Sequence, residues 1–257
     1  MTLIKNISGF RGTVGGPPKE NLTPFDVVTS VSAFCKFLKE KHGDKELIVT
    51  TGRDGRATGE NFHTIVNRTI SLMGINVIDA GLSTTPTLCW GVLNNDSYGG
   101  IMITASHNPE EYNGLKFFNE DGEFLSREDM NKVIEYSNST DFEYQNTMNL
   151  GSINIHKNLI EDHVDDILKL DIIPVEKIRS MDINIVVDGI NSGGAIAIPL
   201  LLDKLSIKYK LINGEILGKF SHTPEPLLEN LTELSKEVKK EKADFGIAVD
   251  PDVDRLV

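Results

Sequence analysis

Residues 99–108 read GGIMITASHN, and the fold expected for the rest of the chain follows from this stretch. Two glycines open the apolar run Ile101–Ile103, which is too short for a helix and suits a strand buried on both faces. The run stops at a cluster of small polar residues that Pro109 closes. Ser106 therefore follows the carboxyl end of a buried strand, where open α/β sheets place their ligands.

Apolar runs of strand length alternate with amphipathic runs of helix length along most of the chain, which predicts layered α/β architecture. A polar stretch without lasting periodicity interrupts the alternation and predicts a domain boundary. We expect two layered α/β domains with mixed sheets flanked by helices, at 1–140 and 158–257, joined by a linker at 141–157. The expected helices cover 24–42, 60–73, 86–93, 158–169 and 227–240, and the expected strands cover 46–51, 75–80, 99–103, 183–187, 207–212 and 245–249.

The composition predicts a soluble globular protein. Of the 257 residues, 39% are hydrophobic and 25% are charged. The net charge of −12 argues against nucleic acid as a partner, because clustered Lys and Arg bind phosphate backbones. No apolar run approaches the ~20 residues of a membrane span, and the start of the chain lacks a signal peptide's apolar stretch. Cys35 and Cys89 do not form a metal-like pair, so we expect reduced thiols and a cytoplasmic location.

A second polar stretch follows the last expected strand and carries aspartates at alternate positions, Asp250, Asp252 and Asp254. Three carboxylates converge only around a positive charge, because like charges a few Å apart repel. Oxygen ligands suit a hard cation such as Mg²⁺. An EF-hand fits poorly, since Arg255 stands where its loop needs glycine. A haloacid-dehalogenase-type phosphatase with Asp250 as nucleophile and a solvated acidic turn stay open as alternatives.

Together these loops resemble the signature loops of the α-D-phosphohexomutase family, which includes phosphoglucomutase, phosphomannomutase and phosphoglucosamine mutase. The resemblance rests on TASHNP at 104–109, NGLK at 113–116 and DPDVDR at 250–255, with weaker likenesses at 9–12, 52–56 and 222–226. Family members have four domains, and this chain resembles domain I, with the phosphoserine loop, and domain II, with the metal loop. Because the chain stops at Val257, soon after a buried strand, we expect a fragment whose second domain is truncated at its C-terminal end.

The resemblance implies an intramolecular phosphotransferase that interconverts hexose 6-phosphate and hexose 1-phosphate in carbohydrate metabolism. Ser106 would carry the phosphoryl group, with hexose 1,6-bisphosphate as intermediate and activator. Mg²⁺ would be the cofactor, held by Ser106, Asp250, Asp252 and Asp254. A phosphoserine adds a charge of about −1.5 to −2 to that of the three carboxylates, so the site also needs local cations.

The remaining site residues would transfer protons and bind phosphate. By the resemblance Lys116 is the general base, a role open to a lysine whose pKa is lowered by burial or by neighbours. A turn predicted at Asn113–Gly114 places Lys116 beside the serine loop. His107 is the second candidate acid or base. Arg11, Arg255 and Asn108 are expected to bind phosphate, and Arg53 is a candidate substrate contact.

Alternatives to a phosphomannomutase or phosphoglucomutase remain at this stage. A phosphoglucosamine mutase would share both loops, because the segment that reads the sugar is missing from this chain. A non-catalytic phosphosugar-binding fragment is an alternative of another class, since the fragment alone is expected to be inactive. The phosphatase interpretation leaves the serine loop unexplained. The expected partner is a hexose phosphate, and a homo-oligomer stays open because helix faces such as 60–73 offer a pairing surface.

Overall fold

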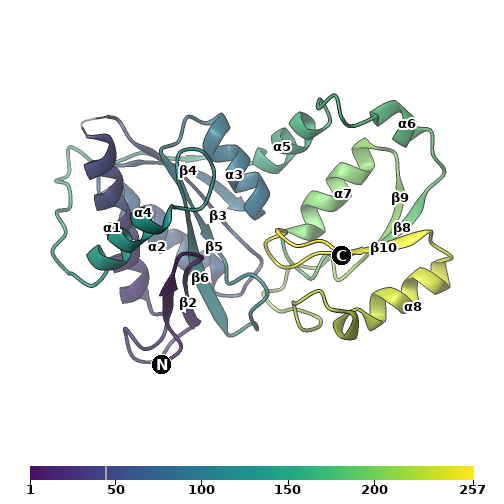
Figure 1. Ribbon diagram of the computed structural model, residues 1–257, viewed down its shortest axis with the longest axis horizontal. Coiled ribbons are helices and arrows are strands. Elements are labelled where there is room, and N and C mark those ends of the chain that lie inside the picture. Colours follow the sequence, from purple (N-terminus) through teal and green to yellow (C-terminus); the bar gives the residue numbers. More distant parts are fainter. Residues whose placement is uncertain (44) are drawn as a thin grey trace.

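The strands of this protein form two sheets, each flanked by helices, in a computed structural model that describes residues 1–43 and 45–257 (Figure 1). The strands are β1 (Ile4–Asn6), β2 (Gly9–Thr13), β3 (Ile48–Arg53), β4 (Asn76–Leu82), β5 (Gly99–Ile103), β6 (Tyr112–Phe118), β7 (Ile153–Ile155), β8 (Asn184–Asp188), β9 (Lys208–Ile212) and β10 (Phe245–Ala248). The α-helices are α1 (Pro24–His42), α2 (Gly59–Leu72), α3 (Thr85–Asn94), α4 (Arg127–Tyr136), α5 (Leu159–Ile167), α6 (Val175–Arg179), α7 (Gly194–Lys204) and α8 (Thr232–Glu241).

Strand β5 lies inside the larger sheet, whose strand order is β1-β2-β6-β5-β3-β4-β7. It runs parallel to β3 and antiparallel to β6, and all its residues are buried, as the apolar run predicted. A Cβ on Gly99 would stand 2.9 Å from the Phe34 ring of α1, and a Cβ on Gly100 would stand 2.7 Å from Val92 of α3. The two glycines therefore allow helices to pack closely on both faces of the strand.

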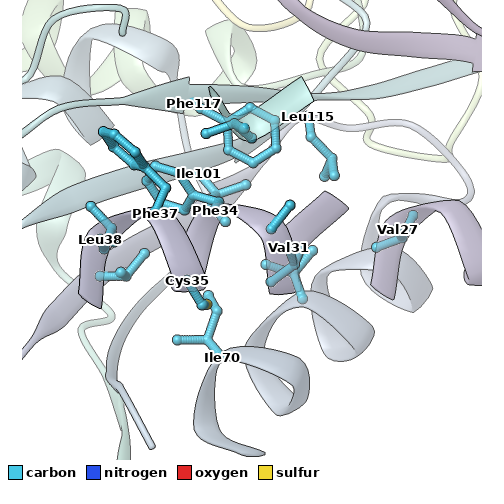
Figure 2. Packing of buried hydrophobic residues seen from close by; sticks show 14 of the residues in the cluster. Val27, Val31, Phe34, Cys35, Phe37, Leu38, Ile70, Ile101, Leu115 and Phe117 are labelled. Atoms are coloured by element: carbon cyan, nitrogen blue, oxygen red, sulfur yellow. The ribbon is translucent and has the colours of Figure 1, made fainter. Parts of the chain in front are cut away.

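Helices cover both faces of this larger sheet. On one face α1, α2 and α4 enclose the main core, in which Phe34 packs with Ile101 and with Phe117, 5.1 Å between the two rings (Figure 2). On the other face Leu88 of α3 packs with Met102. Neighbouring residues of β5 thus serve opposite layers, which is the expected pattern of a buried strand. Within the described residues, no helix is both long enough and apolar enough to cross a membrane.

The smaller sheet has the order β10-β8-β9 and is parallel throughout. Its side chains also alternate between two helical layers. Val186 packs with Leu234 of α8, and Val187 packs with Leu202 of α7. The two layered α/β units expected from the sequence are therefore present. Mixed sheets were expected in both, and the larger sheet is mixed, whereas the described strands of the smaller sheet are all parallel.

Two local expectations differ from the structure. The segment 141–157, predicted to be a linker, contains β7, which pairs in parallel with β4 and so extends the larger sheet. The predicted turn at Asn113–Gly114 lies inside strand β6, and the chain reverses earlier, where the Tyr112 amide donates to Pro109 O at 3.0 Å. Gly114 is required by close strand contact instead, since a Cβ there would stand 2.4 Å from Phe10 O.

Candidate active site

The serine loop and the acidic stretch meet between the two sheets. Ser106 follows the carboxyl end of β5, and Asp250 follows the carboxyl end of β10, so each side chain is presented by the edge where a sheet exposes its loops. The Ser106 hydroxyl donates to Asp250 Oδ2 at 2.7 Å. The structure thus brings together two residues that are 144 positions apart in the chain.

The three aspartates form a cluster of oxygen atoms. One carboxylate oxygen from each of Asp250, Asp252 and Asp254 lies within 4.8 Å of the others. The amides of Asp254 and Arg255 both donate to Asp250 Oδ1 at 3.1 Å, which turns the loop around that carboxylate. Asp252 Oδ1 is buried and has no hydrogen-bond partner among residues 1–43 and 45–257. A buried oxygen without a donor, beside two further carboxylates, fits a divalent cation with oxygen ligands.

Burial and the neighbouring charges shift the pKa values of this cluster in opposite directions. Burial, together with the charges of Asp252 and Asp254, raises the pKa of Asp250 to about 7. Burial also acts to raise the pKa of Asp252, but the ammonium of Lys116 outweighs it and lowers that pKa. An acidic cluster that retains a proton near neutral pH lacks positive charge, which is the deficit that a bound cation removes.

Lys116 supplies the positive charge that the cluster has. Its Nζ donates to Asp252 Oδ2 at 2.6 Å and to Asp254 Oδ2 at 2.5 Å. Burial acts to lower the pKa of Lys116, but the two carboxylates outweigh it and the pKa is raised. A general base would need a lowered pKa, whereas Asp252 and Asp254 raise the pKa of Lys116. Thr85, at the start of α3, also binds Asp252, because its Oγ1 donates to Asp252 Oδ2 at 2.5 Å.

The other predicted residues fall into two groups. Arg11 lies beside the serine loop, with Nη1 3.4 Å from Asn108 Oδ1. Among the described residues, the polar contacts of the Arg53 side chain are local: it donates to Asp54 O at 3.1 Å and lies 4.0 Å from the Glu60 carboxylate. The structure therefore places Arg11 and Asn108 together and does not bring Arg53 to Ser106 through any described contact.

His107 and Arg255 share a carboxylate that sequence reasoning missed. His107 Nε2 lies 3.3 Å from Glu225 Oε2, and Arg255 forms an ion pair with the same side chain. The other ring nitrogen of His107 is 3.3 Å from Ser106 Oγ. Burial, followed by the charge of Arg255, lowers the pKa of His107. The signal for Glu225 was its place in the HTPEP stretch at 222–226, whose role depends on tertiary contacts.

A second missed residue is Arg56, from the loop after β3. Its side chain is fully buried, paired with Asp54, and hydrogen bonded to backbone carbonyls around Ser106. Ser106 itself has a φ of 51°, a left-handed conformation that costs a non-glycine residue about 1–2 kcal/mol. The contacts around the loop must offset that strain.

Comparisons with known proteins place both halves of the chain in one family. Family models described as "Phosphoglucomutase/phosphomannomutase, alpha/beta/alpha domain I" and "domain II" match residues 3–144 and 161–257. A phosphoglucomutase/phosphomannomutase of Thermococcus kodakarensis is 34% identical over 249 residues, which are 96% of this chain and 54% of that protein. A phosphoglucosamine/phosphogalactosamine mutase of Sulfurisphaera tokodaii is 34% identical over 262 residues, with 100% and 54% coverage.

Solved structures share the fold. The crystal structure of a putative phosphomannomutase from Thermus thermophilus superposes with a TM-score of 0.84 at 24% identity, covering 100% of this chain and 56% of that chain. A phosphoglucomutase/phosphomannomutase family protein from Burkholderia thailandensis gives a TM-score of 0.80 at 23% identity, with 97% and 52% coverage. The chain thus spans about half the length of the curated relatives and structures that it matches.

Proposed function

This chain belongs to the phosphoglucomutase/phosphomannomutase family, and on that premise we propose that it supplies the carrier and metal loops of a phosphohexomutase. In this proposal Ser106 carries a phosphoryl group. It gives the group to a hydroxyl of a hexose monophosphate, and the resulting hexose 1,6-bisphosphate returns its other phosphoryl group to Ser106. The observation that carries the proposal is the 2.7 Å contact between Ser106 Oγ and Asp250.

The acidic triplet would hold Mg²⁺ in this reaction. Asp250, Asp252 and Asp254 are the residues that fit the ion, since they offer converging oxygens and one buried oxygen without a donor. Bound there with the oxygen of Ser106, the cation supplies charge neutralisation for the phosphoryl group. Arg11, Asn108 and Arg255 are proposed to bind phosphate oxygens around the same loop.

Proton transfer requires a group near the attacking hydroxyl. When the phosphorus–oxygen bond of phosphorylated Ser106 breaks and the bond to the sugar oxygen forms, the sugar hydroxyl proton must leave. We propose Lys116 as the acceptor and His107 as its rival. Lys116 is held by two carboxylates, whereas His107 has a lowered pKa and lies 3.3 Å from Ser106 Oγ. Lys116 would lose part of the attraction of these carboxylates if they bound a cation, and its pKa would then fall.

The proposed substrate is a hexose phosphate, with the sugar unspecified. Relatives at 34% identity include both a phosphoglucomutase/phosphomannomutase and a phosphoglucosamine/phosphogalactosamine mutase, so these two substrate classes are the alternatives. A cytoplasmic location completes the proposal, supported by two unpaired cysteines, Cys35 and Cys89.

Intact-mass analysis after incubation with a hexose 1,6-bisphosphate and Mg²⁺ tests the carrier. We expect a species heavier by about 80 Da, one phosphoryl group, that is lost in Ser106→Ala and retained in Asp250→Asn. It should survive hydroxylamine, which cleaves an acyl phosphate but not a serine phosphate. A heavier species that persists in Ser106→Ala and is sensitive to hydroxylamine would identify Asp250 as the nucleophile of a phosphatase. A phosphoryl group that peptide mapping finds on a residue other than Ser106 would contradict the carrier role.

A further inference from the structure

Arg56 holds the carrier loop, defined as residues 104–112, although the proposed function assigns Arg56 no role. Its side chain is fully buried, and its Nε lies 3.1 Å from Oδ2 of the equally buried Asp54. The remaining N–H groups donate to backbone carbonyls of the carrier loop. Nη2 reaches Ser106 O at 2.6 Å and Asn108 O at 2.7 Å, and Nη1 reaches Pro109 O at 2.6 Å and Tyr112 O at 2.9 Å.

These contacts show what Arg56 can and cannot do. A guanidinium has five N–H donors, and all five are engaged by Asp54 and the carrier loop. Its charge is neutralised by Asp54 in a site without solvent. Arg56 therefore has no donor left for a phosphate oxygen. Its planar fork matches several fixed carbonyls at once, a geometry that a lysine ammonium does not reproduce.

The same ion pair secures both sides of Ser106. On one side Arg56 binds the Ser106 carbonyl. On the other side the Ser106 amide donates to Thr104 Oγ1 at 2.8 Å, and Thr104 Oγ1 donates in turn to Asp54 Oδ2 at 2.7 Å. The left-handed backbone of Ser106 is thus held at its N–H and at its C=O by one buried network.

The second domain closes over this network. The Phe220 ring lies against the guanidinium, 5.0 Å from Arg56 Cζ to the ring centroid. The neighbouring Ala57 amide donates to Gly218 O at 3.2 Å. Arg56 is therefore fixed by both domains whose loops meet at Ser106 and Asp250.

We propose that Arg56 is a positioning residue for the phosphoryl carrier. It keeps Ser106 in the left-handed conformation that turns its hydroxyl toward Asp250, and it acts through its hydrogen-bond geometry rather than through its charge. The role of Arg56 in phosphoryl transfer rests on the proposed function of Ser106. The role of Arg56 in holding the conformation of the carrier loop does not.

Hydrogen exchange of backbone amides in the whole chain tests the inference with Arg56→Lys and Arg56→Ala. In Arg56→Lys the amides of Asn108 and Tyr112 should exchange about 100-fold faster or more, because the charge is kept while the bonds to four carbonyls are lost. The amides of strand β5 should change little. Arg179→Lys is the matched control, since Arg179 also donates to a backbone carbonyl, Lys204 O, but in the second domain. It should leave the exchange of the carrier loop unchanged.

Chemical rescue separates positioning from plain stability. In Arg56→Ala, millimolar guanidinium should restore protection of the carrier loop, and ammonium at the same concentration should not. The inference is overturned if exchange accelerates equally in the loop and in β5, if loop exchange in Arg56→Lys stays within about twofold of the wild type, or if ammonium rescues as well as guanidinium does. Intact mass of the same samples reports phosphorylation of Ser106. An unphosphorylated wild type with a loosened loop in the variants would contradict the proposed function alone.

Discussion

Replacement of Asp250 by asparagine, in the absence of divalent cations, tests whether the acidic triplet is built around a positive charge. Burial and the charges of Asp252 and Asp254 raise the pKa of Asp250 from 3.8 to about 7 in the folded chain. A carboxyl whose pKa is raised by folding binds its proton more tightly in the folded state. Its contribution to stability is fully present below the unfolded pKa and is lost as the pH rises through the folded pKa.

The size of the effect follows from the shift. A pKa that rises from 3.8 to about 7 corresponds to an upper bound of about 4 kcal/mol. We expect about half of that, because the exposed side chain of Asp254 is screened by water. The asparagine variant keeps an oxygen that can accept from the amides of Asp254 and Arg255, so most of the local geometry is retained.

Urea unfolding with a chelator present measures this difference. The free energies of unfolding of wild type and Asp250→Asn should be nearly equal at about pH 4, and the variant should be more stable by about 2 kcal/mol at about pH 8. Mg²⁺ should then stabilise the wild type more than the variant, because only the wild type keeps all three carboxylates.

Asp182→Asn is the control for this experiment, and its pH dependence should have the opposite sign. A hydrogen bond from Lys208 lowers the pKa of Asp182, so that carboxylate stabilises the folded chain above its unfolded pKa. The reasoning about the triplet is refuted if Asp250→Asn is less stable than the wild type at high pH and responds equally to Mg²⁺.

Three further substitutions test other parts of the structure. Lys116→Met in the presence of a chelator should lower the free energy of unfolding by about 3–5 kcal/mol, because fully buried Asp252 loses its counter-ion. Mg²⁺ should restore part of this loss. An equal stabilisation of the wild type by Mg²⁺ would contradict the prediction. Gly99→Ala should cost about 1–3 kcal/mol in urea unfolding, since the added Cβ would stand 2.8 Å from a backbone oxygen of β6, and unchanged stability would count against the packing argument. A hydrogen bond to Asp188 raises the pKa of His222. The contribution of protonated His222 to the stability of the folded chain is therefore fully present below the unfolded pKa and is lost as the pH rises through the folded pKa. His222→Asn should therefore destabilise the chain more in mild acid than at alkaline pH, and a pH-independent difference in unfolding free energy would be inconsistent with that ion pair.

Several elements could be predicted because their signals are local. The run before Ser106 is apolar, short and bounded by glycine and proline, and it forms β5. Thr23 and Asp26 stand at the spacing of a capping box, and that box begins α1. The aspartates at 250, 252 and 254 were recognisable as a candidate cation site from their alternation after an apolar strand, and the structure brings their oxygens together.

Other features depend on partners that are distant in the chain. The alternation at Ile153–Ile155 is too short to predict a strand by itself, and the segment becomes β7 because the edge of β4 offers hydrogen bonds to it. Glycine is common in turns, but Gly114 lies in a strand, where the absence of a side chain lets β2 and β6 approach closely. Arg56 and Glu225 were missed for the same reason. A charged side chain acquires its role from the carbonyls or cations that the fold gathers around it, and spacing along the chain does not specify them.

By itself the sequence indicated candidate site residues and the strands that present them, because residue type, apolar runs and turn residues act over a few positions. The resemblance of two loops to a known family then indicated that Ser106 and the aspartates act together. Only the tertiary structure decided how these side chains lie relative to one another. It brought Ser106 Oγ to 2.7 Å from Asp250, placed Lys116 between two carboxylates, and buried Arg56 beneath the carrier loop. These contacts join segments far apart in the chain, and their energies depend on burial and distance, which exist only once both sheets have packed.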